Sequence, residues 1–163
     1  MRIEKIKRYD IANGKGIRCT IYVNGCTHHC KGCFNSELWD FQGGVPFEDK
    51  KAKIFELLAD EHCKGLTVLG GEPLQQGEDM LNFLREVKAT FPDKNIWLWT
   101  GYYLNELNDL QKEIISLCDY VVDGRFDETK TGKHLLFRGS SNQTIWENHN
   151  GKFERSEMND IVK

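Results

Sequence analysis

Strand-like and helix-like segments alternate along most of this 163-residue chain, and this alternation restricts the fold more than any other feature. Short apolar stretches, typical of strands, are separated by longer segments whose apolar residues recur at helical spacing. We expect strands at residues 17–24, 65–69, 95–99 and 119–122, and helices at residues 48–61, 77–90 and 103–117. Such an order predicts βαβ units, in which parallel strands are joined by right-handed crossovers. The expected fold class is therefore α/β with a mainly parallel sheet.

Residues 17–24 illustrate the strand pattern. Cys19 and Ile21 fall on one face of an extended segment, and Arg18 and Thr20 fall on the other. This segment runs directly into a loop that is rich in cysteine. Ligands gather at the carboxyl ends of parallel strands, so this loop is well placed for a functional site.

The length suits one compact domain, which we place at residues 1–163. After residue 124 the chain is polar and rich in turns, and we expect one or two further strands near residues 134–137 and 144–147. We expect residues 154–163 to form a loosely held tail. Neither an internal repeat nor a second domain is indicated.

Charge and hydropathy exclude several classes of protein. The net charge is −3 and the Lys and Arg residues are scattered, which argues against a nucleic-acid binder. Apolar stretches fall short of the roughly 20 residues that a membrane span needs. The first residues are charged and lack the apolar segment of a secretory signal. We therefore expect a cytoplasmic protein.

Three cysteines lie within eight residues, at Cys26, Cys30 and Cys33, with the spacing C-x3-C-x2-C. In a reducing compartment such crowding favours metal binding over disulfides. Thiolates are the usual ligands of iron–sulfur clusters, and a [4Fe–4S] cluster normally takes four. A loop with three would leave one iron open to a substrate, as in catalytic metal sites.

An alternative is structural zinc, with His28 or His29 as the fourth ligand. Structural zinc sites usually combine two separated pairs of ligands, and no second pair follows here. The other cysteines are isolated, and we interpret them as buried, inert thiols: Cys19, Cys63 and Cys118.

The cysteine loop, followed one βα unit later by the sequence GGEP, resembles the radical S-adenosylmethionine (SAM) superfamily. Residues 13–18, followed by residues 24–26, resemble the signature of glycyl-radical-enzyme activases. Four further segments resemble the branch whose members activate anaerobic (class III) ribonucleotide reductase: residues 26–35, 96–102, 122–126 and 137–143. The resemblance covers nearly the whole chain and implies a small partial (βα) barrel of the radical SAM type.

The resemblance also implies the ligands and cofactors. Cys26, Cys30 and Cys33 would hold one [4Fe–4S] cluster, whose open iron would bind the methionine part of SAM. Contacts to SAM would come from two segments: Gly32, Cys33 and Phe34 beside the adenine, and Gly70, Gly71, Glu72 and Pro73 beside the amino group. Glycines allow close approach of a backbone to a ligand, and a carboxylate is a natural partner for a cation.

Some positions depart from the family or stay open. The superfamily often has an aromatic residue directly before the third cysteine, where this chain has Gly32. We expect a hydrogen bond from His28 to the cluster or to SAM, and a solvated side chain at His29. Thr100 and Tyr102 are candidates for contacts to ribose or adenine.

The implied activity is reductive cleavage of SAM and formation of a glycyl radical on the large subunit of the anaerobic reductase. A flavodoxin-like protein would donate the electron. Residues 123–126 and 138–143 are the candidate docking surface. Two alternatives stay open: a radical SAM enzyme with another substrate, either a different glycyl radical enzyme or a small molecule, and a non-enzymatic zinc-binding module.

Overall fold

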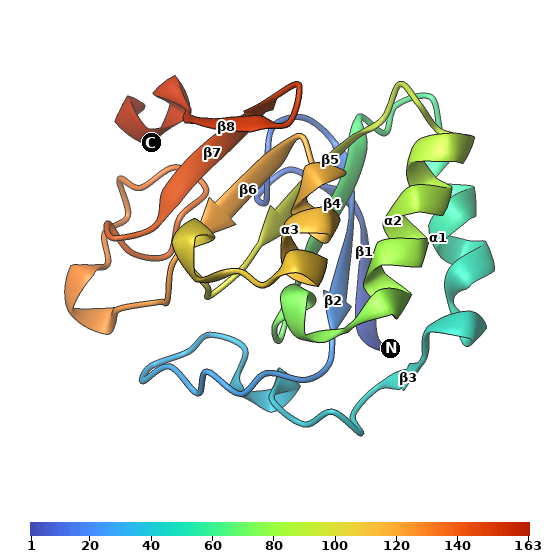
Figure 1. The fold of residues 1–163 in the computed structure, drawn as a ribbon, viewed down its shortest axis with the longest axis horizontal. Coiled ribbons are helices and arrows are strands. Elements are labelled where there is room, and N and C mark those ends of the chain that lie inside the picture. Colours follow the sequence, from blue (N-terminus) through green and yellow to red (C-terminus); the bar gives the residue numbers. More distant parts are fainter.

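The computed structural model describes residues 1–163, which form one eight-stranded sheet and three α-helices (Figure 1). The strands are β1 (Arg2–Asp10), β2 (Arg18–Val23), β3 (Val45–Pro46), β4 (Gly65–Gly70), β5 (Asn95–Trp99), β6 (Tyr120–Asp123), β7 (Thr144–His149) and β8 (Lys152–Arg155). The helices are α1 (Lys51–Leu58), α2 (Glu78–Thr90) and α3 (Asp109–Ser116). None of these helices has the length and apolar character needed to cross a membrane.

The sheet is mixed, with the strand order β3-β1-β2-β4-β5-β6-β7-β8. Its centre is parallel, because β2, β4, β5 and β6 pair in that order and in one direction. Antiparallel pairs extend both edges: β1 with β2 and β3, and β7 with β6 and β8. The α/β class is confirmed. The expectation of a mainly parallel sheet is wrong, since antiparallel strands on both sides flank the predicted βαβ units.

All three helices lie on one face of the sheet (Figure 1), and the main apolar core fills the space between them. On β2, Cys19 and Ile21 belong to this core, as the alternating pattern predicts. Arg18 and Thr20 on the other face are also fully buried. The strand is therefore covered on both sides, and its polar face lies inside the molecule and not in solvent.

Two predicted helices are shorter than expected. The α3 helix begins at Asp109 because the Asn108 side chain accepts a hydrogen bond from the Gln111 amide, and Gln111 closes a reciprocal capping box. Leu104, expected in the same helix, lies in a separate 3₁₀ turn (Leu104–Glu106). The α1 helix likewise begins at Lys51, after a 3₁₀ turn (Phe47–Asp49).

The predicted strand at residues 144–147 is confirmed by β7, whereas residues 134–137 form only an isolated bridge between Leu135 and Val162. In the segment predicted to be a loose tail, the Asn159 side chain is buried. It accepts a hydrogen bond from the backbone amide of Ile145 and donates one to the Ile145 carbonyl.

Candidate metal centre

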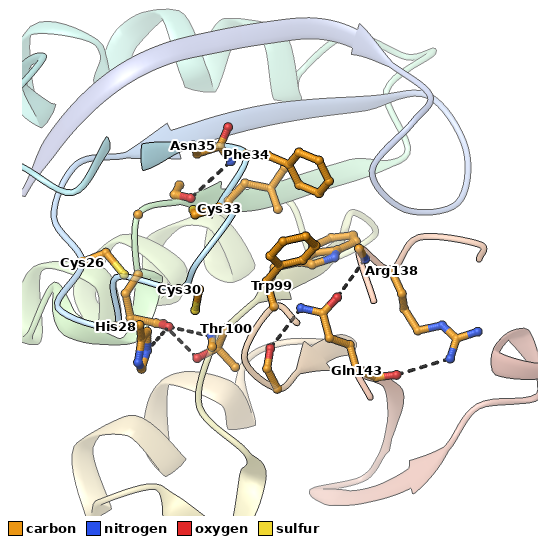
Figure 2. A pocket seen from close by; sticks show the side chains of 18 of the residues that line it. Cys26, His28, Cys30, Cys33, Phe34, Asn35, Trp99, Thr100, Arg138 and Gln143 are labelled. Atoms are coloured by element: carbon orange, nitrogen blue, oxygen red, sulfur yellow. Dashed lines mark hydrogen bonds and ion pairs between the residues drawn. The ribbon is translucent and has the colours of Figure 1, made fainter. Parts of the chain in front are cut away.

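A cavity of about 430 Å³ lies at the carboxyl ends of the parallel strands. The three cysteines of the loop after β2 line it, together with the residues that end β4 and β5. Figure 2 shows Cys26, Cys30 and Cys33 on one side of the cavity, opposite Arg138 and Gln143. The fold therefore brings the predicted ligands together with the C-terminal segment around one space.

Backbone hydrogen bonds fix the start of the cysteine loop. The Gly25 amide donates to the Leu38 carbonyl at 2.7 Å, and the Cys26 amide donates to the Trp39 carbonyl at 3.2 Å. These bonds connect the start of the loop to the 3₁₀ turn that follows it (Ser36–Leu38). As a result Cys26 is buried, while the later cysteines are only half-buried.

Burial and hydrogen bonds have opposite effects on the pKa of the cysteine thiols. Burial raises the pKa of the Cys26 thiol, and the backbone amides of His28 and His29 act in the opposite direction. Burial also raises the pKa of the Cys30 thiol, against the backbone amide of Phe126. Amides that hydrogen-bond a thiolate stabilise it as a metal ligand, and hydrogen bonds to ligand sulfurs tune the potential of a cluster.

The donor set fits a cluster better than it fits one metal ion. Two thiolates on one tetrahedral zinc, each about 2.3 Å from the ion, are about 3.8 Å apart. In the structure, no three His, Cys, Asp or Glu side chains lie close enough together to hold a single ion. A [4Fe–4S] cluster binds each cysteine at a different iron and so separates the sulfurs more widely. The three thiols line one open cavity, where a cluster with one cysteine on each of three irons would be bound.

Glu72 lies at the edge of this site, but its carboxylate is fully used within the protein. One oxygen, Oε1, accepts from the Gly101 amide at 2.7 Å and lies 2.8 Å from His28 Nε2. The other, Oε2, accepts from Thr100 Oγ1 at 2.8 Å and from the Leu74 amide at 2.9 Å. The side chain is 1% exposed. The predicted contact of Glu72 with the amino group of SAM stays a prediction, and the carboxylate has no free acceptor position for it.

The glycines of the GGEP segment allow two pieces of backbone to approach each other. A Cβ atom on Gly70 would collide with Val23 of the neighbouring strand, and one on Gly71 would lie 2.6 Å from the Gly25 carbonyl oxygen. Both glycines also line the cavity, and their predicted contact with the amino group of SAM stays a prediction. Pro73 is buried at the first position of a 3₁₀ turn (Pro73–Gln75) and lies outside the cavity lining.

Two of the three residues expected beside the adenine line the cavity. Cys33 and Phe34 line the cavity, whereas Gly32 does not. The Phe34 ring is 72% exposed and lies 4.8 Å from the Phe126 ring, measured between centroids. Two aromatic rings therefore stand at the mouth of the cavity, one from the cysteine loop and one from the loop after β6.

The two histidines of the loop differ in their surroundings, and the predicted hydrogen bond from His28 to the cluster or to SAM stays a prediction. The His28 side chain is 10% exposed, lines the cavity and meets Glu72. The His29 side chain stacks on Trp39 with 4.2 Å between ring centroids. Thr100 also lines the cavity, but the Tyr102 hydroxyl accepts a hydrogen bond from Gln75 outside it.

The remaining cysteines are core residues, as predicted from their isolated positions in the sequence. Burial raises the pKa of the Cys19 thiol to about 12, and it raises the pKa of Cys118 further. The Cys63 thiol lies 3.3 Å from the Gly65 carbonyl oxygen. None of the three lines the cavity.

Sequence reasoning missed part of the cavity wall. Ala12 and Asn13 reach it from the loop after β1, Tyr22 from the buried face of β2, and Lys163 from the C-terminus. No local motif marks these residues as cavity residues. The polar, inward-facing positions of β2 were the one usable signal, because a polar face of a central strand requires an internal partner or cavity.

An α/β sheet that presents three thiols of one loop in an open cavity fits the class of iron–sulfur proteins with a single cluster. In agreement, the family model described as "4Fe-4S single cluster domain" matches residues 12–146. Several curated relatives are named anaerobic ribonucleoside-triphosphate reductase-activating protein. That of Pasteurella multocida (strain Pm70) is 45% identical over 144 residues, which are 84% of this chain and 91% of the relative.

The relative from Escherichia coli (strain K12) is 41% identical over 141 residues, covering 83% of this chain and 92% of its own length. The relative from Enterobacteria phage T4 is 38% identical over 154 residues, with 93% and 97% covered. The chain belongs to the family of anaerobic ribonucleoside-triphosphate reductase-activating proteins.

Proposed function

We propose that this chain is a radical SAM activase: it cleaves SAM reductively at a [4Fe–4S] cluster and generates the glycyl radical on anaerobic ribonucleotide reductase. The observation that carries the proposal is the set of three thiols from one loop around one cavity, Cys26, Cys30 and Cys33. The names of the relatives support the identity of the target. The chain spans about nine-tenths of the length of these relatives, so the comparison extends to the whole activating protein.

The bound cluster would supply one electron for reductive cleavage of SAM to methionine and a 5′-deoxyadenosyl radical, and that radical would take a hydrogen atom from a glycine Cα of the reductase. The protein contributes binding, orientation and exclusion of competing partners. Cys26, Cys30 and Cys33 would hold the cluster through their thiolates. The cavity beyond them has room for the ligand and an apolar lining that includes Leu69, Trp99 and Phe126.

Several finer features belong to the same proposal. The sheet with helices on one face supports a partial barrel of the radical SAM type, formed by a single domain. The electron donor is a flavodoxin-like protein, and the partner is the large subunit of the reductase. The activity is cytoplasmic and involves neither nucleic acid nor membrane, in keeping with the net charge of −3. Residues 123–126 and 138–143 face the partner, which agrees with the presence of Phe126 and Arg138 in the cavity wall.

The test begins with anaerobic reconstitution of the full chain with iron and sulfide. We expect about four irons and four sulfides per chain, and formation of 5′-deoxyadenosine when SAM and a strong reductant are added. Mixing with an anaerobic reductase should then produce a glycyl-type doublet in electron paramagnetic resonance. Bound zinc without iron or sulfide would contradict the proposal in favour of a zinc-binding module. An active cluster with no doublet on a matched reductase would refute the proposed target.

A further inference from the structure

The cysteine loop rests on the turn that follows β4. The Glu72 amide donates to the Gly25 carbonyl at 2.7 Å. The Gln76 side chain donates through Nε2 to the Asn24 carbonyl at 3.1 Å. The backbone just before Cys26 is therefore fixed on residues of the GGEP segment and its continuation.

Two side chains of the same turn hold the part of the loop between Cys26 and Cys30. Gln75 accepts from the Thr27 amide at 2.9 Å and donates to the Thr27 hydroxyl at 2.8 Å. Beside this pair, His28 Nε2 lies 2.8 Å from Glu72 Oε1. The segment between two predicted cluster ligands is thus attached at consecutive residues.

Glu72 extends this attachment to a third strand. Its carboxylate also accepts from Thr100 and Gly101, which follow β5, so one side chain joins the ends of β2, β4 and β5. The His28 ring packs edge-on against Tyr102, with 4.6 Å between ring centroids. These contacts hold the His28 ring between the two turns.

The direction of the His28 bond follows from the other partners of Glu72. The Leu74 and Gly101 amides and the Thr100 hydroxyl already donate to the carboxylate. A carboxylate has about four acceptor positions, and His28 takes the fourth. His28 therefore donates through Nε2, and the carboxylate has no acceptor position left for another donor.

We propose that Glu72 is a positioning residue, which holds the cysteine loop through His28 and so keeps the three thiols in place before the cluster arrives. This inference rests on the proposed function, because the thiols are taken to be the cluster ligands. It assigns Glu72 to the loop and not to direct contact with the amino group of SAM. A side chain that is 1% exposed and bonded to three segments has little freedom to turn toward a ligand.

The experiment compares His28→Ala, Glu72→Gln and the double variant with the unaltered chain. Hydrogen exchange of residues 26–33 is measured first on the chain without cluster. We expect each single variant to speed exchange of the loop amides at least about tenfold, since a hydrogen bond to a charged group is lost. The double variant should match Glu72→Gln, because His28 acts on the loop only through Glu72, whereas Glu72→Gln also disturbs the bonds from Leu74, Thr100 and Gly101. His28→Gln, which retains a donor, should restore slow exchange.

The reconstituted proteins provide a second readout. We expect the reduced clusters of His28→Ala and Glu72→Gln both to have an altered paramagnetic resonance spectrum, with SAM affinity lowered in both. The matched control is the exposed pair Glu61 and His62, whose nitrogen and oxygen lie 3.5 Å apart. Glu61→Gln and His62→Ala should leave loop exchange and spectrum unchanged.

Two results would overturn the inference. The first is a loss of SAM binding in Glu72→Gln without faster exchange of its loop amides, together with normal SAM binding by His28→Ala. In that case Glu72 would contact SAM directly. The other is unchanged loop exchange in both single variants. Each of these leaves the proposed function intact, whereas failure of the unaltered chain to bind a cluster would refute the function itself. Since His28 lies on a loop outside the core, its variants test the idea even if Glu72→Gln does not fold.

Discussion

The side chain of Glu128 occupies the space in which a side chain at residue 32 would lie. Gly32 has a φ of +75°, a conformation that favours glycine, and a Cβ atom there would collide with the Glu128 carboxylate. The superfamily often has an aromatic residue at this position. In this chain the 3₁₀ turn (Glu128–Lys130) covers that part of the loop, and the aromatic rings at the cavity mouth come from Phe34 and Phe126 instead.

Gly32→Ala is expected to reduce the iron bound after reconstitution, because the new methyl group forces either the loop or Glu128 to move. Combining it with Glu128→Ala should restore part of the iron, since the collision is removed while the positive φ remains. Glu128→Ala alone should change the free energy of unfolding by less than about 0.5 kcal/mol, because its ion pair with Lys31 is exposed. Iron analysis and urea unfolding check these values. Equal iron loss in the single and double variants would show that the collision is unimportant.

Cys30→Ala is expected to lower bound iron and 5′-deoxyadenosine to background. The fold should persist, with a change in unfolding free energy within about 1 kcal/mol, because Cys30 is only half-buried and lies outside the core. Iron analysis, product chromatography and circular dichroism give the three readouts. Normal SAM cleavage by this variant would refute the assignment of Cys30 as a ligand.

Cys19→Ala should lower the stability of the fold and leave the bound iron unchanged, which is the opposite of the result expected for Cys30→Ala. Cys19 is 1% exposed in the core beneath the helices, so the variant should lose about 1 kcal/mol of stability. Its iron content should equal that of the unaltered chain. An iron-free Cys19→Ala protein with a native circular dichroism spectrum would mean that this thiol takes part in the site.

Gly71→Ala tests the contact between the cysteine loop and the turn after β4. The added Cβ atom would lie 2.6 Å from the Gly25 carbonyl oxygen, and overpacking of this kind costs about 2 kcal/mol. We expect lower stability together with lower iron content. As a control, Gly151→Ala introduces strain at a φ of +95° in the turn between β7 and β8, far from the site. It should lower stability while iron binding stays complete, and iron loss in both variants would point to general instability.

Asp10 predicts a pH dependence of stability. Burial acts to raise the pKa of this carboxyl, but hydrogen bonds from Thr20, Asn13 and the Ala12 amide outweigh it, so the pKa is lowered. A folded-state pKa below the unfolded value of about 3.9 stabilises the protein above that pH. The contribution is lost as the pH falls through the folded pKa. In urea unfolding from pH 6 to pH 2.5, the stability gap between the unaltered chain and Asp10→Asn should therefore shrink below about pH 4. A constant gap would contradict the prediction.

The sequence predicted the centre of the fold better than its edges. The parallel strands and α2 carry dense apolar periodicity because both sides of the central sheet are buried, and β5 begins and ends at the predicted residues. The β1 strand was missed, since only Ile3 and Asp10 among its nine residues are buried and its pattern is mostly polar. The Asn108 cap shortened α3, although the apolar stripe continues through the turn before it.

The candidate site, too, was predicted only in part from the sequence. A motif can mark a loop, and the spacing of Cys26, Cys30 and Cys33 is enough by itself to predict a metal site in this one. The partners of Glu72 could not be predicted, because Thr100 and Gly101 approach it only through the packing of β5 beside β4. For the same reason the sequence did not place Asn13 in the cavity wall.

The aromatic wall of the cavity has a practical consequence. Trp99 lines the space that the three cysteines enclose, and its ring is stacked 5.5 Å from that of Trp97. An iron–sulfur chromophore in that space would quench indole fluorescence by energy transfer. The chain thus contains an intrinsic optical probe, and the progress of cluster loading can be followed in real time from tryptophan emission without any added label.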